Sequence, residues 1–162
     1  MEAGFSKTEY MTTDGKRDQQ NTIQLDGVSI KRVKSFKYLR AMTELSGEMD
    51  TDVNHRVQSG GNNWMKVTGV ICDRRVPIRL KGKVYREVVR PAVTYGLGAA
   101  ALKQVEEKKL DVTEMKMLRW MSGVTLLDRI SNEDIRGSVK AVEISKKVQE
   151  ARLRWVGHLK ER

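Results

Sequence analysis

The sequence predicts an α+β protein that is mainly helical, with a small antiparallel β element followed by a helical bundle. Two patterns predict this order. Apolar and polar residues alternate between residues 22 and 40, as in strands, whereas beyond residue 47 apolar residues recur every three to four positions, as in helices. The chain has 162 residues and is 39% hydrophobic, which suits one compact domain or two small ones. We expect residues 1–46 to form the β element and residues 47–162 the helical domain.

The β element is predicted from a turn signal between two short alternating runs. Residues 22–25 and 28–30 alternate, and Asp26-Gly27 between them favours a tight hairpin. Residues 35–39 form a third extended run that is rich in aromatic side chains. Residues 1–21 are polar and weakly patterned, with a turn signal at residues 12–15.

Helical spacing begins near Asp50 or Thr51, either of which can cap the first helix. The pair Gly60-Gly61 lies inside this helix and should weaken or kink it, at roughly 1 kcal/mol for each glycine relative to alanine. Pro77 suits the first turn of a second helix, and Pro91 is expected to kink that helix. Three further helices are predicted over residues 104–121, from Asn132, and from residue 142 to the end.

The expected helical core consists of apolar residues that recur at helical spacing. In the first, third and last helices these residues are Val53, Val57, Trp64, Val67, Ile71, Leu110, Met117, Leu118, Met121, Ile144, Val148, Ala151 and Trp155. Trp120 lies in a similar stripe. For all three tryptophans we expect core packing rather than stacking on nucleic-acid bases.

The most basic part of the chain runs from Arg74 to Arg90, with Glu87 as its one acidic residue. Four of its cations are spaced four, three and four residues apart, which places them on one side of a helix. Leu80, Val84 and Val88 follow another side. We therefore expect a helix that docks on the core and presents a cationic ridge outward, made by Arg79, Lys83, Arg86 and Arg90.

A polyanion is the natural partner of such a ridge, and nucleic acid is the commonest polyanion. Most charge runs are merely solvated faces, but such faces usually mix both signs. The net charge of the chain is +10, and residues 50–103 hold ten basic and four acidic side chains. This concentration in the middle of the chain favours a binding surface.

Composition and spacing argue against several other classes. Cys72 is the only cysteine, which excludes an internal disulfide and fits an intracellular protein, nuclear or cytoplasmic. No apolar run reaches 18 residues, so no membrane span is expected. His55 and His158 lack metal-ligand spacing with Cys72. Asp50 and Asp52 are better explained as a helix start than as a metal site. No metal, cofactor or catalytic constellation is predicted.

A series of short blocks resembles the reverse transcriptases of non-long-terminal-repeat (LINE-like) retrotransposons, in the part that follows the catalytic palm. The blocks occur in the order of that family. They are KTEYM (7–11), FKYL (36–39), HRVQ (55–58), KGKVY (81–85), RPA (90–92), YG (95–96), EMKMLRWM (114–121), NEDIR (132–136) and RLRWVGH (152–158).

The resemblance implies a primer grip at the end of the palm in residues 1–46 and a thumb-like domain in residues 47–162. It implies binding of a template–primer duplex, RNA or DNA, through its phosphates, with palm and fingers upstream as partners. Lys7 would lie near the incoming nucleotide, although a solvated lysine is the simpler interpretation. Beside the ridge, the predicted contacts are Lys37, Arg40, Arg74 and Arg75.

The sequence also departs from the family. Arg40 replaces a usual glycine, Gly98 and Ala100 replace a usual acid and tryptophan, and the Ala-Asp-Asp metal site is absent and expected upstream. We therefore expect no polymerase activity from this chain. Two alternatives remain open: a transposon remnant that binds a protein partner, and an enzyme whose catalytic part lies outside this sequence.

Overall fold

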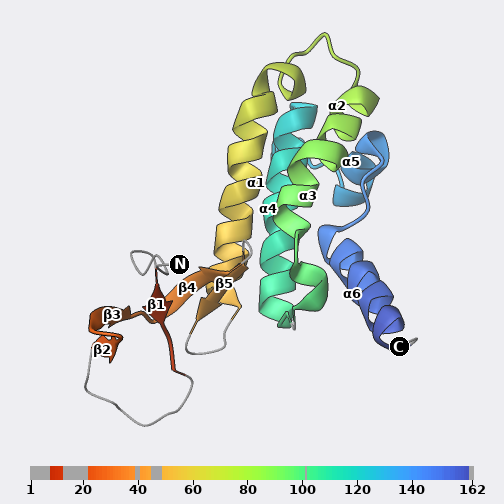
Figure 1. Ribbon diagram of the computed structural model, residues 1–162. Coiled ribbons are helices and arrows are strands. Elements are labelled where there is room, and N and C mark those ends of the chain that lie inside the picture. The colour runs from red at the N-terminus through yellow and green to blue at the C-terminus, as the bar shows by residue number, and fades with distance from the viewer. Residues whose placement is uncertain (1–7, 13–21, 39–40, 45–48, 101, 161–162) are drawn as a thin grey trace. The chain divides into compact units, whose positions relative to one another are not determined.

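The computed structural model describes residues 8–12, 22–38, 41–44, 49–100 and 102–160. It divides the chain into two compact units, Met1–Asp52 and Val53–Arg162. The described strands belong to the first unit and are followed by a series of helices (Figure 1). The predicted α+β class with a predominance of helix is therefore confirmed.

The predicted hairpin is confirmed in the first unit. Strands β2 (Thr22–Leu25) and β3 (Val28–Arg32) pair antiparallel, with Ile23 opposite Ile30. The turn between them has positive φ at both residues, 49° at Asp26 and 79° at Gly27, as a two-residue hairpin requires. Strand β1 (Glu9–Tyr10) adds a parallel pairing to β3. With only two residues, β1 is too short to show an alternating pattern.

A second hairpin consists of β4 (Ser35–Tyr38) and β5 (Ala41–Glu44). The extended run predicted at residues 35–39 is thus a strand through Tyr38, but its partner β5 was not predicted. The amide of Met42 donates to Asp52 Oδ1 at 2.8 Å, and Thr51 Oγ1 donates to Glu44 Oε2 at 2.7 Å. These bonds connect β5 to the first turn of the helix that follows it.

Helices make up the described part of the second unit. The regular helices are α1 (Asp50–Ile71, which begins in the first unit), α2 (Ile78–Val84), α3 (Arg90–Thr94), α4 (Gln104–Ser122), α5 (Asn132–Val139) and α6 (Ile144–Lys160). A π-helical turn, η2 (Tyr85–Val89), connects α2 directly to α3, and a 3₁₀ turn, η3 (Leu97–Ala99), follows α3. No helix in the described ranges is long and apolar enough to cross a membrane.

The core of the second unit contains two groups of buried side chains. One group joins Ile71 to residues of η2, α4 and α5, among them Tyr85, Leu118 and Val139. The other joins Val53 to residues of α3, η3, α4 and α6. The predicted core positions Val53, Ile71, Leu110, Leu118, Met121, Ile144 and Val148 are all buried.

Gly60 allows α1 and α3 to approach closely. A Cβ atom at this position would lie 2.3 Å from Val93 Cγ2, so only glycine fits. Helix α1 runs without interruption through Gly60-Gly61 from Asp50 to Ile71. The conformational cost of glycine is offset by the close packing that its missing side chain permits.

Pro91 is the second residue after the π-helical turn. A proline ring clashes with the carbonyl four residues earlier, and a wider turn relieves such a clash. The amide of Arg90 accordingly bonds to the carbonyl of Tyr85, five residues back. The disturbance that was predicted for Pro91 is therefore a π turn before it.

Candidate nucleic-acid interface

The basic stretch from Arg74 to Arg90 separates into two sets of side chains in the structure. Four cations are exposed, and we call them the exposed basic segment: Arg74, Arg75, Arg79 and Lys83. The other three, Lys81, Arg86 and Arg90, are buried or half-buried and bond to other parts of the chain.

The exposed basic segment begins in the turn between α1 and α2. The Arg75 amide donates to Asp73 Oδ1 at 2.8 Å, which shapes this turn. The Arg75 guanidinium lies 3.9 Å from the same carboxylate but is 94% exposed, so this pair is weak. Among the described residues, Arg74, Arg79 and Lys83 take part in no ion pair. Arg79 and Lys83 are four residues apart on α2 and project from one side of it.

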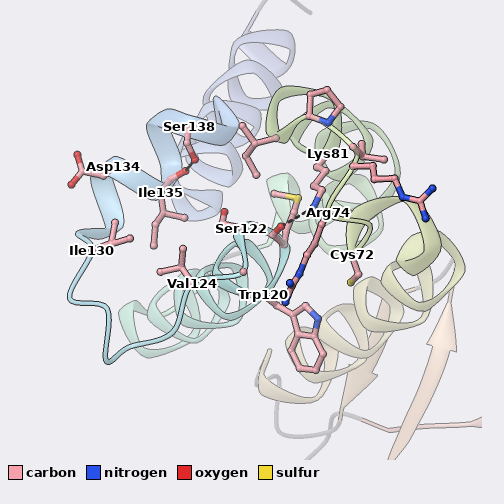
Figure 2. A pocket seen from close by; sticks show the side chains of 16 residues that line it. Cys72, Arg74, Lys81, Trp120, Ser122, Val124, Ile130, Asp134, Ile135 and Ser138 are labelled. Atoms are coloured by element: carbon pink, nitrogen blue, oxygen red, sulfur yellow. Dashed lines mark hydrogen bonds between the residues drawn. The ribbon is translucent and has the colours of Figure 1, made fainter.

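A large pocket adjoins this segment. Its volume is about 820 Å³, and Arg75 is among the residues that line it. Arg74 and Lys81 lie on one side of the pocket and α5 residues such as Asp134 on the other (Figure 2). Trp120, near the end of α4, also lines the pocket and is 72% exposed. The predicted core roles of Trp120 and of Trp155, which is half-exposed, are therefore wrong, whereas Trp64 packs against the core.

The orientation of Trp120 follows from the geometry of α4. Leu110, Leu118 and Met121 define the buried stripe of this helix. Trp120 is two residues from Leu118, and two residues turn a helix by about 200°, so the indole points away from that stripe. The sequence contained a usable signal, because Trp120 is four residues from the exposed Lys116 and shares its side of the helix.

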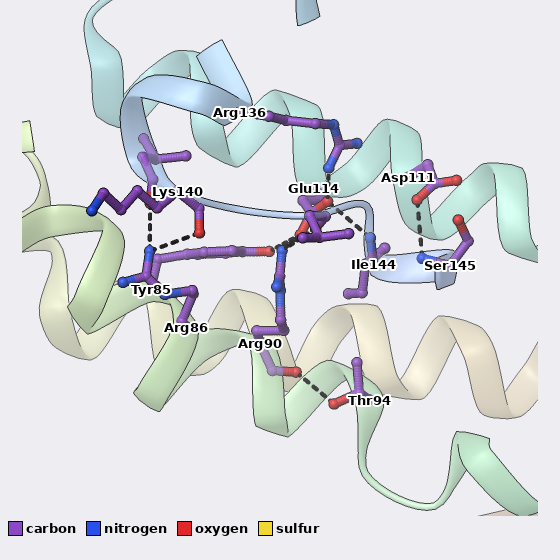
Figure 3. Close-up of polar contacts among 12 residues, drawn as sticks. Tyr85, Arg86, Arg90, Thr94, Asp111, Glu114, Arg136, Lys140, Ile144 and Ser145 are labelled. Carbon is purple, nitrogen blue, oxygen red and sulfur yellow. Dashed lines mark hydrogen bonds and ion pairs between the residues drawn. The ribbon is translucent and has the colours of Figure 1, made fainter. Parts of the chain in front are cut away.

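Arg90 is directed into the protein, where it meets a buried carboxylate. Its Nη2 atom lies 2.6 Å from Glu114 Oε1, and Arg90 is 7% exposed (Figure 3). Glu114 also accepts hydrogen bonds from Arg136, from Tyr85 Oη at 2.9 Å and from the amide of Ile144 at 3.1 Å. We call these five residues the Glu114 cluster. Two cations and two neutral donors thus surround one buried anion.

The charges of this cluster shift the pKa values of its members. Burial and the Glu114 carboxylate raise the pKa of Tyr85 far above its usual range, because both oppose a phenolate. Burial disfavours the charge of Arg90, but attraction to Glu114 outweighs it and raises the pKa of Arg90. Tyr85 is therefore a neutral donor and Arg90 a permanent cation.

Arg86 fixes the end of α5. It donates to the carbonyl oxygens of Val139 and Lys140, the second at 3.0 Å. Lys140 is the C-cap of α5 and has a left-handed backbone, with φ of 52°. The last carbonyls of a helix lack helical partners, and Arg86 supplies one. Gly82 permits this approach, since a Cβ there would lie 2.3 Å from the carbonyl oxygen of Val139.

The prediction of one outward ridge is therefore wrong for Arg90, and Arg86 is only half-exposed. The cause is the π turn, which acts as one inserted residue and rotates the residues after it by about 100° relative to a regular helix. The buried side of α2 and η2 is formed by Lys81, Tyr85 and Val89, while Leu80 and Val88 are exposed.

The remaining predicted contacts belong to the first unit. Lys37 is exposed on β4. Arg40 lies outside the described residues, as do Lys7 and the side chains of Phe36 and Tyr38. In the described part of the chain, no group of three or more His, Cys, Asp or Glu side chains is placed to hold a metal ion.

Comparison with known proteins finds a distant relative. Over 149 residues the chain is 24% identical to an uncharacterized transposon-derived protein of Caenorhabditis elegans. The similarity indicates a transposon origin. It covers 88% of this chain but 50% of the relative, so the chain spans about half the length of that protein. No family model and no solved structure matches the chain.

Proposed function

We propose that the second unit binds the phosphate backbone of a nucleic-acid duplex through the exposed basic segment. The observation that carries this proposal is the exposure of four cations within ten residues, Arg74, Arg75, Arg79 and Lys83, with Asp73 as the nearest acid in sequence. Exposed cations can contact phosphates without any rearrangement of the protein. Binding is favoured because these contacts release the counterions that are condensed on the nucleic acid.

The transposon-derived relative supports a more specific form of the proposal. The chain would be the primer-grip and thumb part of a LINE-like reverse transcriptase, with Lys37 and Arg40 as further phosphate contacts. Its partners would be a template–primer duplex and the palm and fingers of such an enzyme. In this form the chain positions a duplex, because phosphate contacts fix register without reading sequence. It would carry out no chemistry, because the Ala-Asp-Asp metal site of the family is absent from this sequence.

Salt-dependent binding tests the proposal. A labelled RNA–DNA duplex is titrated with the intact chain at several salt concentrations, and the slope of log affinity against log salt is measured. Each lost phosphate contact reduces the slope by about 0.9. We expect the double variant Arg79→Ala/Lys83→Ala to reduce it by about 1.8 and to weaken binding to different sequences equally.

A matched double variant controls for net charge. Lys146→Ala/Lys147→Ala also removes two positive charges from a helix, but both lysines are paired, with Glu143 and Glu150. This control should leave the slope almost unchanged. Equal effects of the two double variants, or absence of duplex binding at low salt, would contradict the proposal.

Exposed apolar residues favour a second candidate, a transposon remnant that binds a protein partner. Leu126 and Leu127 follow α4 and are almost completely exposed. Leu126 also lines a hollow of about 360 Å³ together with Val112 and Met115. A docked partner would remove these side chains from water. If Leu126→Ser/Leu127→Ser abolished the cellular role of the chain while duplex binding was kept, this candidate would replace the first.

A further inference from the structure

The pocket beside the exposed basic segment combines an exposed aromatic side chain with cations. Trp120 lines it together with Arg74 and Arg75, and its volume of about 820 Å³ exceeds what one nucleotide needs. Lys81 also lines the pocket, but its ammonium group donates to the carbonyl oxygen of Met121 at 3.3 Å. The two exposed arginines are therefore the cations available to a ligand on this side.

Trp120 also borders a second hollow, of about 570 Å³, whose lining includes Lys116 and Leu126. Gly123 and Val124 line both hollows, so the hollows are neighbours that meet at the indole. Lys116 is exposed and four residues before Trp120 on α4, which places it about one helical turn away. Cations are thus available on both sides of an exposed aromatic ring.

The wall around the indole is held in shape by Arg119. Its guanidinium donates to the carbonyl oxygens of Thr125 at 3.2 Å and Ile130 at 3.0 Å, and to Asn132 Oδ1 at 2.8 Å. The Asp128 carboxylate accepts two further hydrogen bonds, from the amide and from the hydroxyl of Thr125. These hydrogen bonds fix the loop from residue 123 to residue 131 next to Trp120 before any ligand binds. Binding therefore carries little additional cost in conformational entropy for this loop.

We propose that this site binds an unpaired nucleotide of a nucleic-acid strand. The base would stack on the indole of Trp120, and the flanking phosphates would lie against Arg74 and Arg75 on one side and Lys116 on the other. Base stacking on aromatic side chains tolerates any sequence, and a groove of cations follows the backbone. The inference rests on the proposed function and adds to it a preference for duplexes that end in a single-stranded extension.

Charge complementarity favours a nucleotide over an apolar peptide at this site. Three exposed cations, Arg74, Arg75 and Lys116, line the two hollows that meet at the indole, whereas Asp134 is the one acidic residue among those that line the large pocket. Asp134 is moreover occupied, since it accepts a hydrogen bond from Ser131 Oγ at 2.6 Å. An apolar partner would offer these cations no counter-charge, while phosphates supply one.

The test compares two labelled RNA–DNA duplexes, one blunt and one with a short single-stranded thymidine tail. We expect the intact chain to bind the tailed duplex more tightly. Trp120→Ala should weaken binding of the tailed duplex by up to roughly 5- to 150-fold, which is the range for the loss of one stacked base. Its affinity for the blunt duplex should not change. Trp120→Phe should keep much of the gain, because the ring is retained.

Trp155→Ala is the matched control, since Trp155 is exposed on α6 and lines neither hollow. Addition of single-stranded oligothymidine should also quench tryptophan fluorescence in the wild type and much less in Trp120→Phe. Equal binding of both duplexes by the wild type, or an unchanged tail effect in Trp120→Ala, would overturn the inference and leave the proposed function standing. Failure to bind either duplex would overturn both.

Discussion

The exposed basic segment and the Glu114 cluster use the same residue types for opposite purposes. Arg79 and Arg90 are eleven residues apart and looked equivalent by helical spacing. Arg79 is exposed, whereas Arg90 is buried against Glu114 of α4 and joined there by Arg136 of α5. A run of cations can therefore be partly structural. Which of its members are buried depends on partners that are distant in the sequence, such as Glu114 for Arg90.

The strongest test of this contrast removes the charge at the centre of the Glu114 cluster. Glu114→Gln would leave Arg90 and Arg136 buried without an anion while preserving the shape of the side chain. We expect a loss of about 3–5 kcal/mol in the free energy of unfolding, the usual cost of breaking a buried ion pair. Urea denaturation followed by circular dichroism measures this loss.

Glu143→Gln provides the comparison for that variant. Glu143 is paired with Lys146 at 2.7 Å, but both side chains are in contact with water. Solvent screens such a pair, so the loss should be far smaller. Similar losses for the two variants would mean that the Glu114 cluster contributes no more than a surface pair.

The next largest effect concerns Tyr85 and depends on pH. Tyr85→Phe removes the donor 2.9 Å from Glu114 and should cost about 1.5–3 kcal/mol at neutral pH, as for a hydrogen bond to a charged group. The pKa of Tyr85 is raised in the folded state by burial and by Glu114. In the unfolded chain it is about 10.

The sign of the pH dependence follows from these two pKa values. Above about pH 10 the unfolded chain loses the phenolic proton while the folded protein keeps it, so folding is disfavoured by about 1.4 kcal/mol per pH unit. The stability advantage of the wild type over Tyr85→Phe should be complete below pH 10 and shrink above it. Urea denaturation between pH 8 and about 11 measures this, and a constant difference would show that Tyr85 ionises normally.

The smallest effect on stability is expected in the exposed basic segment. Arg79→Ala/Lys83→Ala removes two side chains that lie in water, so the free energy of unfolding should change by no more than about 0.5 kcal/mol for each. Arg90→Ala, in contrast, leaves Glu114 with one cation and should destabilise strongly. Thermal unfolding of both variants separates the two roles, and strong destabilisation by the first variant would erase the distinction.

Much of the fold could be predicted from local sequence signals. The hairpin at Asp26-Gly27 and the helices at residues 104–122 and 132–139 have strong turn, capping or periodic patterns. Strand β5 and strand β1 were missed, because short strands carry too few residues for an alternating pattern. The reason for a glycine at position 60, its close contact with Val93, lies outside the local sequence and could not be predicted from it.

The candidate site was predicted less completely, for a related reason. Exposure of Arg79 and Lys83 agrees with the helical spacing, but the π turn changes the phase before Arg90. Periodicity assumes a constant angle per residue and cannot reveal such a turn. The apolar stripe at helical spacing predicts a core position for Trp120, which the structure does not bear out. Its actual direction depends on which face of α4 the buried Leu118 and Glu114 occupy.

The π turn at Tyr85–Val89 also has a consequence for sequence comparison. A π turn arises when a helix accommodates one extra residue without unwinding. A relative lacking this residue would align with a gap of one position here, and its helix would be regular through this turn. The residues after the turn would keep their direction, because the wide turn absorbs the extra residue. A buried arginine at the position of Arg90 and an acid at the position of Glu114 are therefore expected with either length of this helix.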